Sequence, residues 1–283
     1  MRILVTGAHG QLGGDLVPVL SGHDVVAVDV EELDITDHSA VISFITELAP
    51  DRVINCAAMT AVDACETNEE LAWAVNATGV ENLADGCKAV DAHLLTISTD
   101  YVFDGTKSSP YVESDTPNPQ SVYGRSKLAG EKAAGPMSTI VRTSWLCGIH
   151  GPNMVKTIVR LLAGEGELRF VDDQIGCPTF AADLAPMVAR LAVDAAPGIF
   201  HVTNQGVVSW FELAREVAVA VGADPERVLP CATVDLQPPR PAPRPANSAL
   251  DNAALRAAGY PALPSHNVGL VEMLSAMDLP GRS

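Results

Sequence analysis

The chain has 283 residues, of which 47% are hydrophobic and 19% are charged, so it can bury a sizeable core and is not a disordered chain. Its formal net charge of −17 argues against nucleic acid and against a membrane surface as partners. The six cysteines are scattered without a CxxC pair, which is typical of reduced thiols in a cytoplasmic protein and predicts no metal site. The first residues enter a strand directly, and no apolar run is long enough to span a membrane, so we expect neither a signal peptide nor a membrane helix.

The first predicted element is an apolar run of strand length, Arg2–Thr6, followed by Gly7, Gly10 and Gly13. An apolar helical pattern begins at Leu12. A strand, a glycine turn and a helix in this order are typical of dinucleotide binding. The glycines let the backbone approach a pyrophosphate, whose charge lies at the helix N-terminus. A tight turn without a ligand is the alternative interpretation.

The second predicted strand, Val25–Val28, is followed by Asp29. An acid at this position can bind the ribose hydroxyls of the adenosine. Its neighbours Val30 and Glu31 are not basic, so no adjacent side chain is suited to bind a 2′-phosphate. The chemistry therefore favours NADH, or the use of both NADH and NADPH. A plain strand-end aspartate is the alternative.

Further periodic segments alternate between strand and helix. We predict strands at residues 52–55, 93–97 and 139–142 and helices at residues 38–48, 68–90 and 123–134. This alternation predicts an α/β fold with a doubly wound parallel sheet of the Rossmann type and right-handed crossovers. Its ligands should lie at the carboxyl ends of the strands, where small residues such as Ala57 and Ala58 leave room for a cofactor.

A candidate catalytic group follows the fourth strand. Ser98 and Thr99 form a hydroxyl pair at its end, and Tyr123 and Lys127 are four residues apart on a predicted helix, so they share one face. A nearby ammonium lowers the pKa of a tyrosine, which makes the phenol a usable proton donor near neutral pH. Taken alone, the pair is a weak signal, and a half-buried tyrosine beside a solvated lysine is the favoured interpretation.

The regular alternation of strands and helices ends after about Ser144. Helices at 152–163, 182–193 and 209–221 and strands at 168–171 and 199–202 predict a smaller lobe. We expect a dinucleotide-binding domain over residues 1–145, with later segments returning to the sheet, and a mainly substrate-binding lobe over residues 146–283. The proline-rich segment Pro238–Pro245 is either an exposed polyproline ligand for an SH3-like domain or an extended segment that packs across the lobe.

Taken together, the motifs resemble those of the extended short-chain dehydrogenases, and among them the dTDP-4-dehydrorhamnose reductases. The resemblance covers nearly the whole chain. Its most specific segments are STDYVFDG (98–105), RTSW (142–145) and DQIGCPT (173–179). It implies an enzyme that reduces the C4 ketone of dTDP-4-dehydrorhamnose to dTDP-L-rhamnose. It also implies NADPH as the cofactor, with NADH as a second candidate, and a monomer or homodimer that binds a nucleotide sugar.

The resemblance assigns roles to particular residues. It places the catalytic triad on Thr99, Tyr123 and Lys127, and the last two also contact the cofactor. The remaining cofactor positions fall on Gly7, Gly10, Gln11, Leu12, Gly13, Asp34, Ile35, Ala57 and Ala58, with Asp29 added from its own chemistry. The substrate contacts fall on Asp100, Tyr101 and Trp145, although Trp145 is equally compatible with an aromatic plug between lobes and Tyr101 with a core position.

Two departures from the family pattern keep other functions open. Met59 and Cys147 stand where the family commonly has tyrosine, so a related dTDP-4-keto-6-deoxysugar of a secondary-metabolite pathway is an alternative substrate. An epimerase or dehydratase would share the cofactor loop, but a dehydratase carries a second acid where Tyr101 follows Asp100. A non-catalytic NADP-binding regulatory subunit is the alternative from a different class. The candidate cations for a diphosphate are Lys156, Arg160, Arg240 and Arg244, and each is equally compatible with a solvated surface role.

Overall fold

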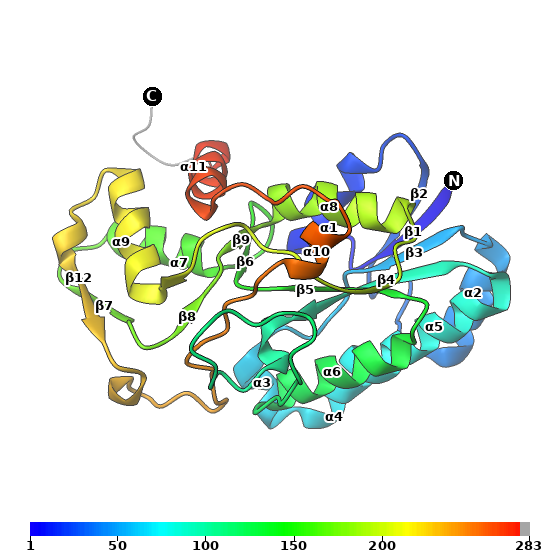
Figure 1. Cartoon of the computed structure of the whole chain (residues 1–283), viewed down its shortest axis with the longest axis horizontal. Helices are drawn as coiled ribbons and strands as arrows, with labels where there is room; N and C mark the ends of the chain where they lie inside the picture. The colour runs from blue at the N-terminus through cyan, green and yellow to red at the C-terminus, as the bar shows by residue number, and fades with distance from the viewer. Residues whose placement is uncertain (278–283) are drawn as a thin grey trace.

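A computed structural model describes residues 1–277 and places a six-stranded parallel sheet at the centre of the molecule (Figure 1). The strand order is β10-β5-β4-β3-β1-β2. The strands are β1 (Arg2–Thr6), β2 (Asp24–Val28), β3 (Arg52–Asn55), β4 (His93–Thr99), β5 (Thr139–Thr143) and β10 (Gly198–His201). The chain order reverses between β1 and β3, and this switch point is where such sheets bind ligands. The predicted doubly wound α/β fold is confirmed.

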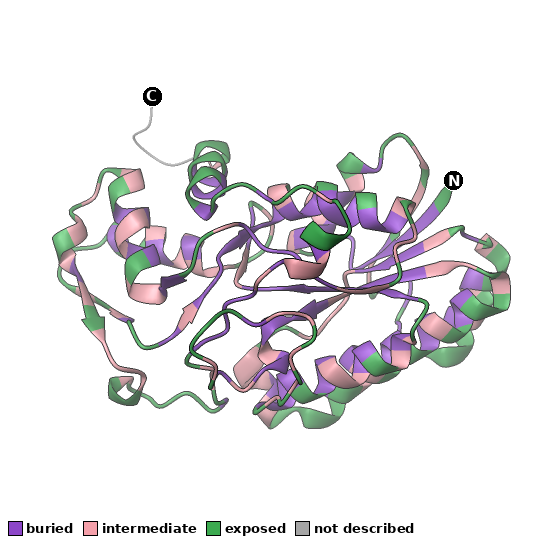
Figure 2. Cartoon of the chain, in the orientation of Figure 1, coloured by how far each residue is buried: buried purple, intermediate pink, exposed green. Residues whose placement is uncertain are grey.

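Helices cover both faces of the sheet (Figure 1). One face carries α2 (His38–Leu48), α5 (Gly79–Val90) and α6 (Val122–Ala134), and the other carries α1 (Gln11–Val19) and α8 (Ala181–Val193). Buried residues concentrate on the strands and on the helix sides that face them (Figure 2). Strands that are covered on both faces read as continuous apolar runs, which is why they were recognisable in the sequence.

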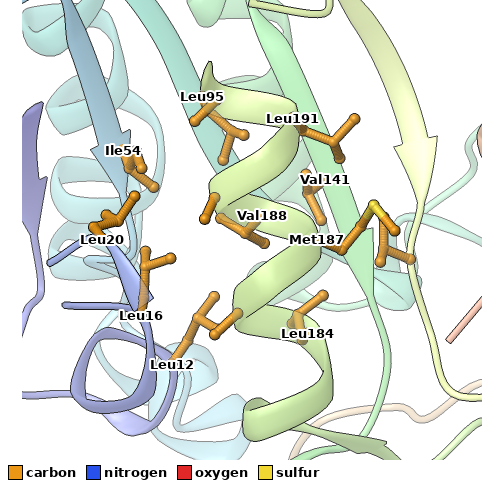
Figure 3. Close-up of a cluster of buried hydrophobic side chains, with 14 of the residues drawn as sticks. Leu12, Leu16, Leu20, Ile54, Leu95, Val141, Leu184, Met187, Val188 and Leu191 are labelled. Carbon is orange, nitrogen blue, oxygen red and sulfur yellow. The ribbon is translucent and has the colours of Figure 1, made fainter. Parts of the chain in front are cut away.

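The helix α8 and the strand β10 correct the prediction that residues 182–193 and 199–202 belong to the smaller lobe. β10 pairs in parallel with β5 at the edge of the main sheet. Leu184, Val188 and Leu191 of α8 join one buried cluster with Leu16 of α1 and Ile54 of β3 (Figure 3). Both segments therefore return to the sheet. The functional division at residues 145 and 146 stays a prediction.

The long helix predicted over residues 68–90 is divided in the structure. It consists of α4 (Glu69–Trp73), a π turn η1 (Ala74–Thr78) and α5. The side chain of Asn76 in this turn donates to Met59 O and to Ser126 Oγ, each at 3.1 Å, and accepts from Met59 N at 2.9 Å. The irregular turn therefore ties the loop after β3 to α6.

A smaller lobe has a hydrophobic cluster of its own, built on α7 (Met154–Leu162), α9 (Trp210–Val221), β7 (Leu168–Val171) and β12 (Val228–Cys231). Residues 278–283 of the predicted lobe lie outside the described residues. The remaining elements are α3 (Val62–Thr67), η2 (Asp100–Val102), β6 (Leu146–Cys147), β8 (Ile175–Gly176), β9 (Thr179–Phe180), β11 (Val208–Ser209), η3 (Pro225–Arg227), η4 (Thr233–Asp235), α10 (Ala253–Ala257) and α11 (His266–Ala276).

The proline-rich segment packs against the sheet side of the molecule. Arg244 donates to both carboxylate oxygens of Asp63 in α3, at 3.0 and 2.8 Å, and Ala242 N donates to the same carboxylate at 3.2 Å. Ala242 is buried. The segment is therefore anchored on α3, and not across the smaller lobe as the packed interpretation expected, while Pro238, Pro239, Pro241 and Pro243 stay exposed.

Two further expectations from the sequence concern the cysteines and membrane-spanning helices. All six cysteines are free thiols. Within residues 1–277, no helix combines the length and the apolar character that crossing a membrane requires.

Candidate active site

A groove runs along the carboxyl ends of the sheet strands. Its larger part is a cleft of about 610 Å³, lined by the ends of β1, β4 and β5 and by α6. A second hollow of about 320 Å³ continues it past the end of β2. The two parts share Gly7, Gly10, Cys56 and Ala58. All predicted site residues line one of the two parts.

The glycine loop forms a cradle in which side chains do not fit. Gly7 has φ +66°, and a Cβ there would lie 2.5 Å from Ala57 N. A Cβ on Gly13 would lie 2.4 Å from Gly7 O. Helix α1 begins at Gln11, and no side chain of the described chain caps it at Gly10. Its first-turn N–H groups are therefore available to an anion such as a pyrophosphate.

The far end of the groove carries two acids with different surroundings. The Asp29 carboxylate accepts hydrogen bonds from His9 N at 3.0 Å and Val30 N at 2.8 Å, and its side chain keeps 26% exposure. The Asp34 carboxylate is engaged in a turn, where it accepts from Thr36 N and Oγ1 at 2.9 and 2.8 Å. Of the two, Asp29 is the acid better placed to bind ribose hydroxyls.

Thr99, Tyr123 and Lys127 lie together at the centre of the cleft and all three are buried. Thr99 is the last residue of β4, and the other two occupy successive turns of α6. Close approach of α6 to η2 depends on Gly124, where a Cβ would lie 2.2 Å from Tyr101 O. The structure thus brings together the three residues that the sequence proposed as a catalytic triad.

The electrostatics of this group differ from the sequence expectation. Burial raises the pKa of Tyr123, and a hydrogen bond from Thr99 opposes that rise. Burial lowers the pKa of Lys127 to about 8, while Glu131 and Cys56 oppose the fall. Lys127 Nζ donates to Ile97 O at 2.6 Å. The expectation that the Lys127 charge lowers the Tyr123 pKa is wrong here, because desolvation of the phenolate is the larger effect.

Asp100 is held by internal hydrogen bonds. Its Oδ1 accepts from Thr99 Oγ1 and its Oδ2 from Ser144 Oγ, each at 3.0 Å. Burial raises its pKa to about 6. Tyr101 packs edge-on against Tyr123 with the ring centroids 5.6 Å apart. Both line the cleft, but the Asp100 oxygens already have partners. Substrate contact by Asp100 and Tyr101 stays a prediction.

Trp145 and Trp210 form an aromatic wall of the cleft. Their rings stack with centroids 3.5 Å apart and planes within 5°. Trp145 follows β5, whereas Trp210 is the first residue of α9 in the smaller lobe. Trp145 therefore both lines the cleft and bridges the two parts of the molecule. This position is compatible with a substrate contact and with an aromatic plug between the lobes. Trp210 was missed because nothing in its local sequence places it near Trp145.

Thr143 is a further cleft residue that sequence reasoning missed. It lies at the end of β5 and lines the cleft, and its buried Oγ1 has no hydrogen-bond partner among residues 1–277. A buried hydroxyl without a partner is costly, so a ligand group that bonds to it would be stabilised. Its position directly before Ser144 and Trp145 in the RTSW segment was the available signal.

Three of the four candidate cations are bonded to protein oxygens. Lys156 Nζ donates to Ile149 O and Gly151 O, and Arg240 and Arg244 pair with Asp63. The described part of the chain holds no cluster of three or more histidine, cysteine or acidic side chains that could bind a metal.

The parallel sheet, the glycine loop and the Thr99–Tyr123–Lys127 group define an extended short-chain dehydrogenase/reductase. Comparison with known proteins agrees. The family model described as RmlD substrate binding domain matches residues 1–279. A dTDP-4-dehydrorhamnose reductase of Streptomyces griseus is 46% identical over 98% of this chain and 94% of its own. The chain therefore belongs to the dTDP-4-dehydrorhamnose reductase family, and it is an oxidoreductase.

Two further proteins are similar over most of their length. The crystal structure of a dTDP-4-dehydrorhamnose reductase from Bacillus anthracis in complex with NADP superposes with a TM-score of 0.92, at 39% identity, and covers 98% of this chain and 99% of that one. A dTDP-4-keto-6-deoxy-D-glucose reductase of Streptomyces niveus is 44% identical over 81% of this chain and 82% of its own.

Proposed function

We propose that the protein reduces the C4 ketone of dTDP-4-dehydrorhamnose to dTDP-L-rhamnose with NADPH, and that NADH is a second candidate cofactor. The observation that carries the proposal is the meeting of Thr99, Tyr123 and Lys127 in one cleft that continues into the glycine loop. The Streptomyces griseus relative supports the choice of sugar, and the Bacillus anthracis structure with NADP supports the choice of cofactor.

The residues of the groove fit a dinucleotide. Gly7 and Gly13 leave space against the backbone for a pyrophosphate at the start of α1. Asp29 can accept from the adenosine ribose of NADH but opposes the 2′-phosphate of NADPH, which keeps NADH as the second candidate. The Thr143 hydroxyl, for which residues 1–277 supply no hydrogen-bond partner, suits a polar group of the nicotinamide end. When bound, the cofactor supplies a hydride to the sugar carbon.

Side chains of the protein supply the proton that the reduced carbonyl oxygen requires. Tyr123 donates its phenolic proton to the oxygen on which negative charge develops, because its raised pKa keeps it protonated at neutral pH. Thr99 is placed to hydrogen-bond in the same region, and Lys127 balances the charge of the phenolate that remains. Such groups accelerate the reaction because their interactions strengthen in the transition state.

The direct test is the loss of absorbance at 340 nm with each cofactor on dTDP-4-keto-6-deoxyglucose plus its 3,5-epimerase, followed by identification of the product. Formation of dTDP-L-rhamnose is the expected result. Folded protein that binds NADPH but oxidises it with no sugar-nucleotide ketone would refute the proposal and favour the regulatory interpretation.

Tyr123→Phe tests the assigned proton donor. We expect kcat to fall at least about 10²-fold, the usual contribution of general acid catalysis, with little change in cofactor binding. Tyr260→Phe is a matched control, because its hydroxyl bonds Asp194 outside the cleft. A Tyr123→Phe enzyme with more than about a tenth of wild-type turnover would defeat the assignment.

A related 4-keto-6-deoxysugar is the second candidate substrate, and the Streptomyces niveus relative favours it. Met59 lines the groove, whereas Cys147 is buried and its Sγ lies 3.4 Å from Trp145 O. Of the two departures from the family pattern, Met59 can therefore change the shape of the groove directly, whereas Cys147 can change it only through the position of Trp145. Oxidation of NADPH that yields a different sugar would identify this case. The cytoplasmic location and the monomeric or homodimeric state stay predictions.

A further inference from the structure

Helix α7 of the smaller lobe begins beside the glycine loop. Its N-cap residue Asn153 and Gln11, the first residue of α1, both line the cleft. Asn153 Nδ2 donates to Gln11 Oε1 at 3.0 Å. One hydrogen bond between two side chains therefore joins the helix that follows the glycine loop to a helix whose Val155 and Ile158 lie in the core of the smaller lobe.

The orientation of the Asn153 amide is fixed by its other partners. Its Oδ1 accepts from Lys156 N at 3.0 Å and so caps α7, which leaves Nδ2 as the donor. Nδ2 donates to Gly148 O at 2.8 Å as well as to Gln11. A rotated amide would set oxygen against oxygen and N–H against N–H, so the direction of the bond to Gln11 is determined.

The segment before α7, residues 148–153, packs against α1. A Cβ on Gly14 would lie 2.5 Å from His150 Cδ2. Lys156 Nζ donates to two backbone oxygens of the segment, at 2.6 and 2.9 Å, which fastens the segment to α7. The segment is therefore part of the smaller lobe and contacts α1 directly, and the bond from Asn153 to Gln11 lies at this junction.

We propose that Asn153 is a positioning residue, which through its hydrogen bond to Gln11 holds the smaller lobe at the distance from the cofactor loop that hydride transfer requires. The glycine loop belongs to the sheet side, whereas Trp210 contributes a wall of the cleft from the lobe. Hydride transfer needs the two reacting carbons in near contact, and a misplacement of about 1 Å can cost about 100-fold in rate. The inference rests on the proposed function.

The same bond lets the lobe respond to the cofactor. The backbone N–H of Gln11 belongs to the first turn of α1, where a pyrophosphate is expected to bind. A bound pyrophosphate orders this turn, and the Gln11 side chain passes the order on to Asn153 and to the start of α7. A lobe that is already ordered loses less conformational entropy when the sugar nucleotide binds.

Two substitutions remove the bond from opposite sides. Asn153→Ser keeps a capping oxygen for Lys156 N, because serine and asparagine cap helices about equally well, but the shorter side chain does not reach Gln11. Gln11→Met keeps the length of the side chain and removes the acceptor. His150→Ala is the control, because it removes a different contact of the same segment with α1, a pair with Asp15 at 3.6 Å, outside the cleft lining.

Hydrogen–deuterium exchange tests the link without a substrate. We expect NADPH to slow exchange over residues 148–158 at least about threefold in the wild type and in His150→Ala, but not in Asn153→Ser or Gln11→Met. Exchange in the glycine loop should slow in every variant, which reports that the cofactor is bound. Protection of residues 148–158 that persists in both variants, or that the wild type lacks, would overturn the inference.

Single-turnover reduction tests the positioning role. Hydride transfer should slow about five- to tenfold in each variant and by no more in the double variant, because both changes remove the same bond. The deuterium isotope effect on steady-state kcat, with NADPH labelled at the transferred hydrogen, should rise in both variants, which a general loss of stability would not produce. Losses that multiply in the double variant, or rates within about twofold of wild type in both single variants, would contradict the inference.

The two experiments separate this inference from the proposed function. Protection by NADPH that both variants abolish, in a protein that reduces no sugar-nucleotide ketone, would refute the proposed function while supporting the link. Ketone reduction at the wild-type rate in both variants would support the proposed function and overturn the positioning role.

Discussion

At the scale of single residues, ligand binding in the groove depends on the missing side chains of the glycine loop and on the carboxylate of Asp29. Gly7 and Gly13 are required because a Cβ at either position would lie within 2.5 Å of backbone atoms. We expect Asp29 to act by its charge, since its carboxylate stands beside the glycine loop, where it accepts from His9 N at 3.0 Å and from Val30 N at 2.8 Å. A carboxylate there favours ribose hydroxyls and repels a 2′-phosphate.

Asp29→Asn should therefore shift the cofactor preference toward NADPH. Losing a charge-assisted hydrogen bond to the ribose weakens NADH, and losing the negative charge helps NADPH. We expect the ratio of kcat/KM for NADPH to that for NADH to rise about tenfold, measured in steady state with both cofactors. Glu31→Gln makes the same charge change at an exposed neighbour and serves as the control. An equal shift in both variants would show that general charge, and not the site, sets the preference.

At the scale of elements, a buried ion pair fixes α6 to the sheet. Glu131 lies one helical turn after Lys127 and accepts from Arg142 of β5 through Nε at 2.8 Å and Nη2 at 2.6 Å. Ser98 of β4 donates to the same carboxylate at 2.5 Å. Three elements thus meet at one charge, and the positions of Tyr123 and Lys127 depend on it.

Glu131→Gln should destabilise the fold by about 3–5 kcal/mol, because it leaves the Arg142 guanidinium buried without its counter-charge. The free energy of unfolding in urea measures this. The double variant Glu131→Gln with Arg142→Met removes both charges and should recover part of the loss. A single variant within about 1 kcal/mol of wild type would show that the pair contributes little.

At the scale of the whole molecule, the cleft lies between the sheet and the smaller lobe. The stack of Trp145 on Trp210 joins these parts, since one ring follows β5 and the other begins α9. The glycine loop and Asp29, by contrast, belong to the sheet side alone. Substrate and cofactor binding should therefore respond differently to changes in the lobe.

Trp210→Ala should raise KM for the nucleotide sugar about tenfold while leaving the Kd for NADPH unchanged. The lost stacking, about 0.5–1.5 kcal/mol beyond area burial, frees Trp145 to leave the wall of the cleft. Steady-state kinetics and a fluorescence titration measure the two constants. Trp73→Ala is the matched control, because Trp73 lies on α4 and is 37% exposed. A parallel loss of cofactor binding would show that the lobe supports the whole site.

The layered sheet, the glycine cradle and the Tyr123–Lys127 pair could be predicted from the sequence, because they depend on local periodicity, on residues without side chains and on one helical turn. The sequence did not determine which later segments return to the sheet. Helix α8 has an ordinary amphipathic pattern and strand β10 has only four residues, so neither specifies the core it faces.

The pKa values and the long-range contacts of the site became visible only in the folded molecule. The pKa of Tyr123 rises because the fold buries the phenol, an effect larger than that of any sequence neighbour. Trp210 meets Trp145 across 65 positions of sequence, and Ser144 meets Asp100 across 44. Such contacts depend on how whole elements pack, and desolvation depends on everything that covers a residue, so neither can be read from local sequence.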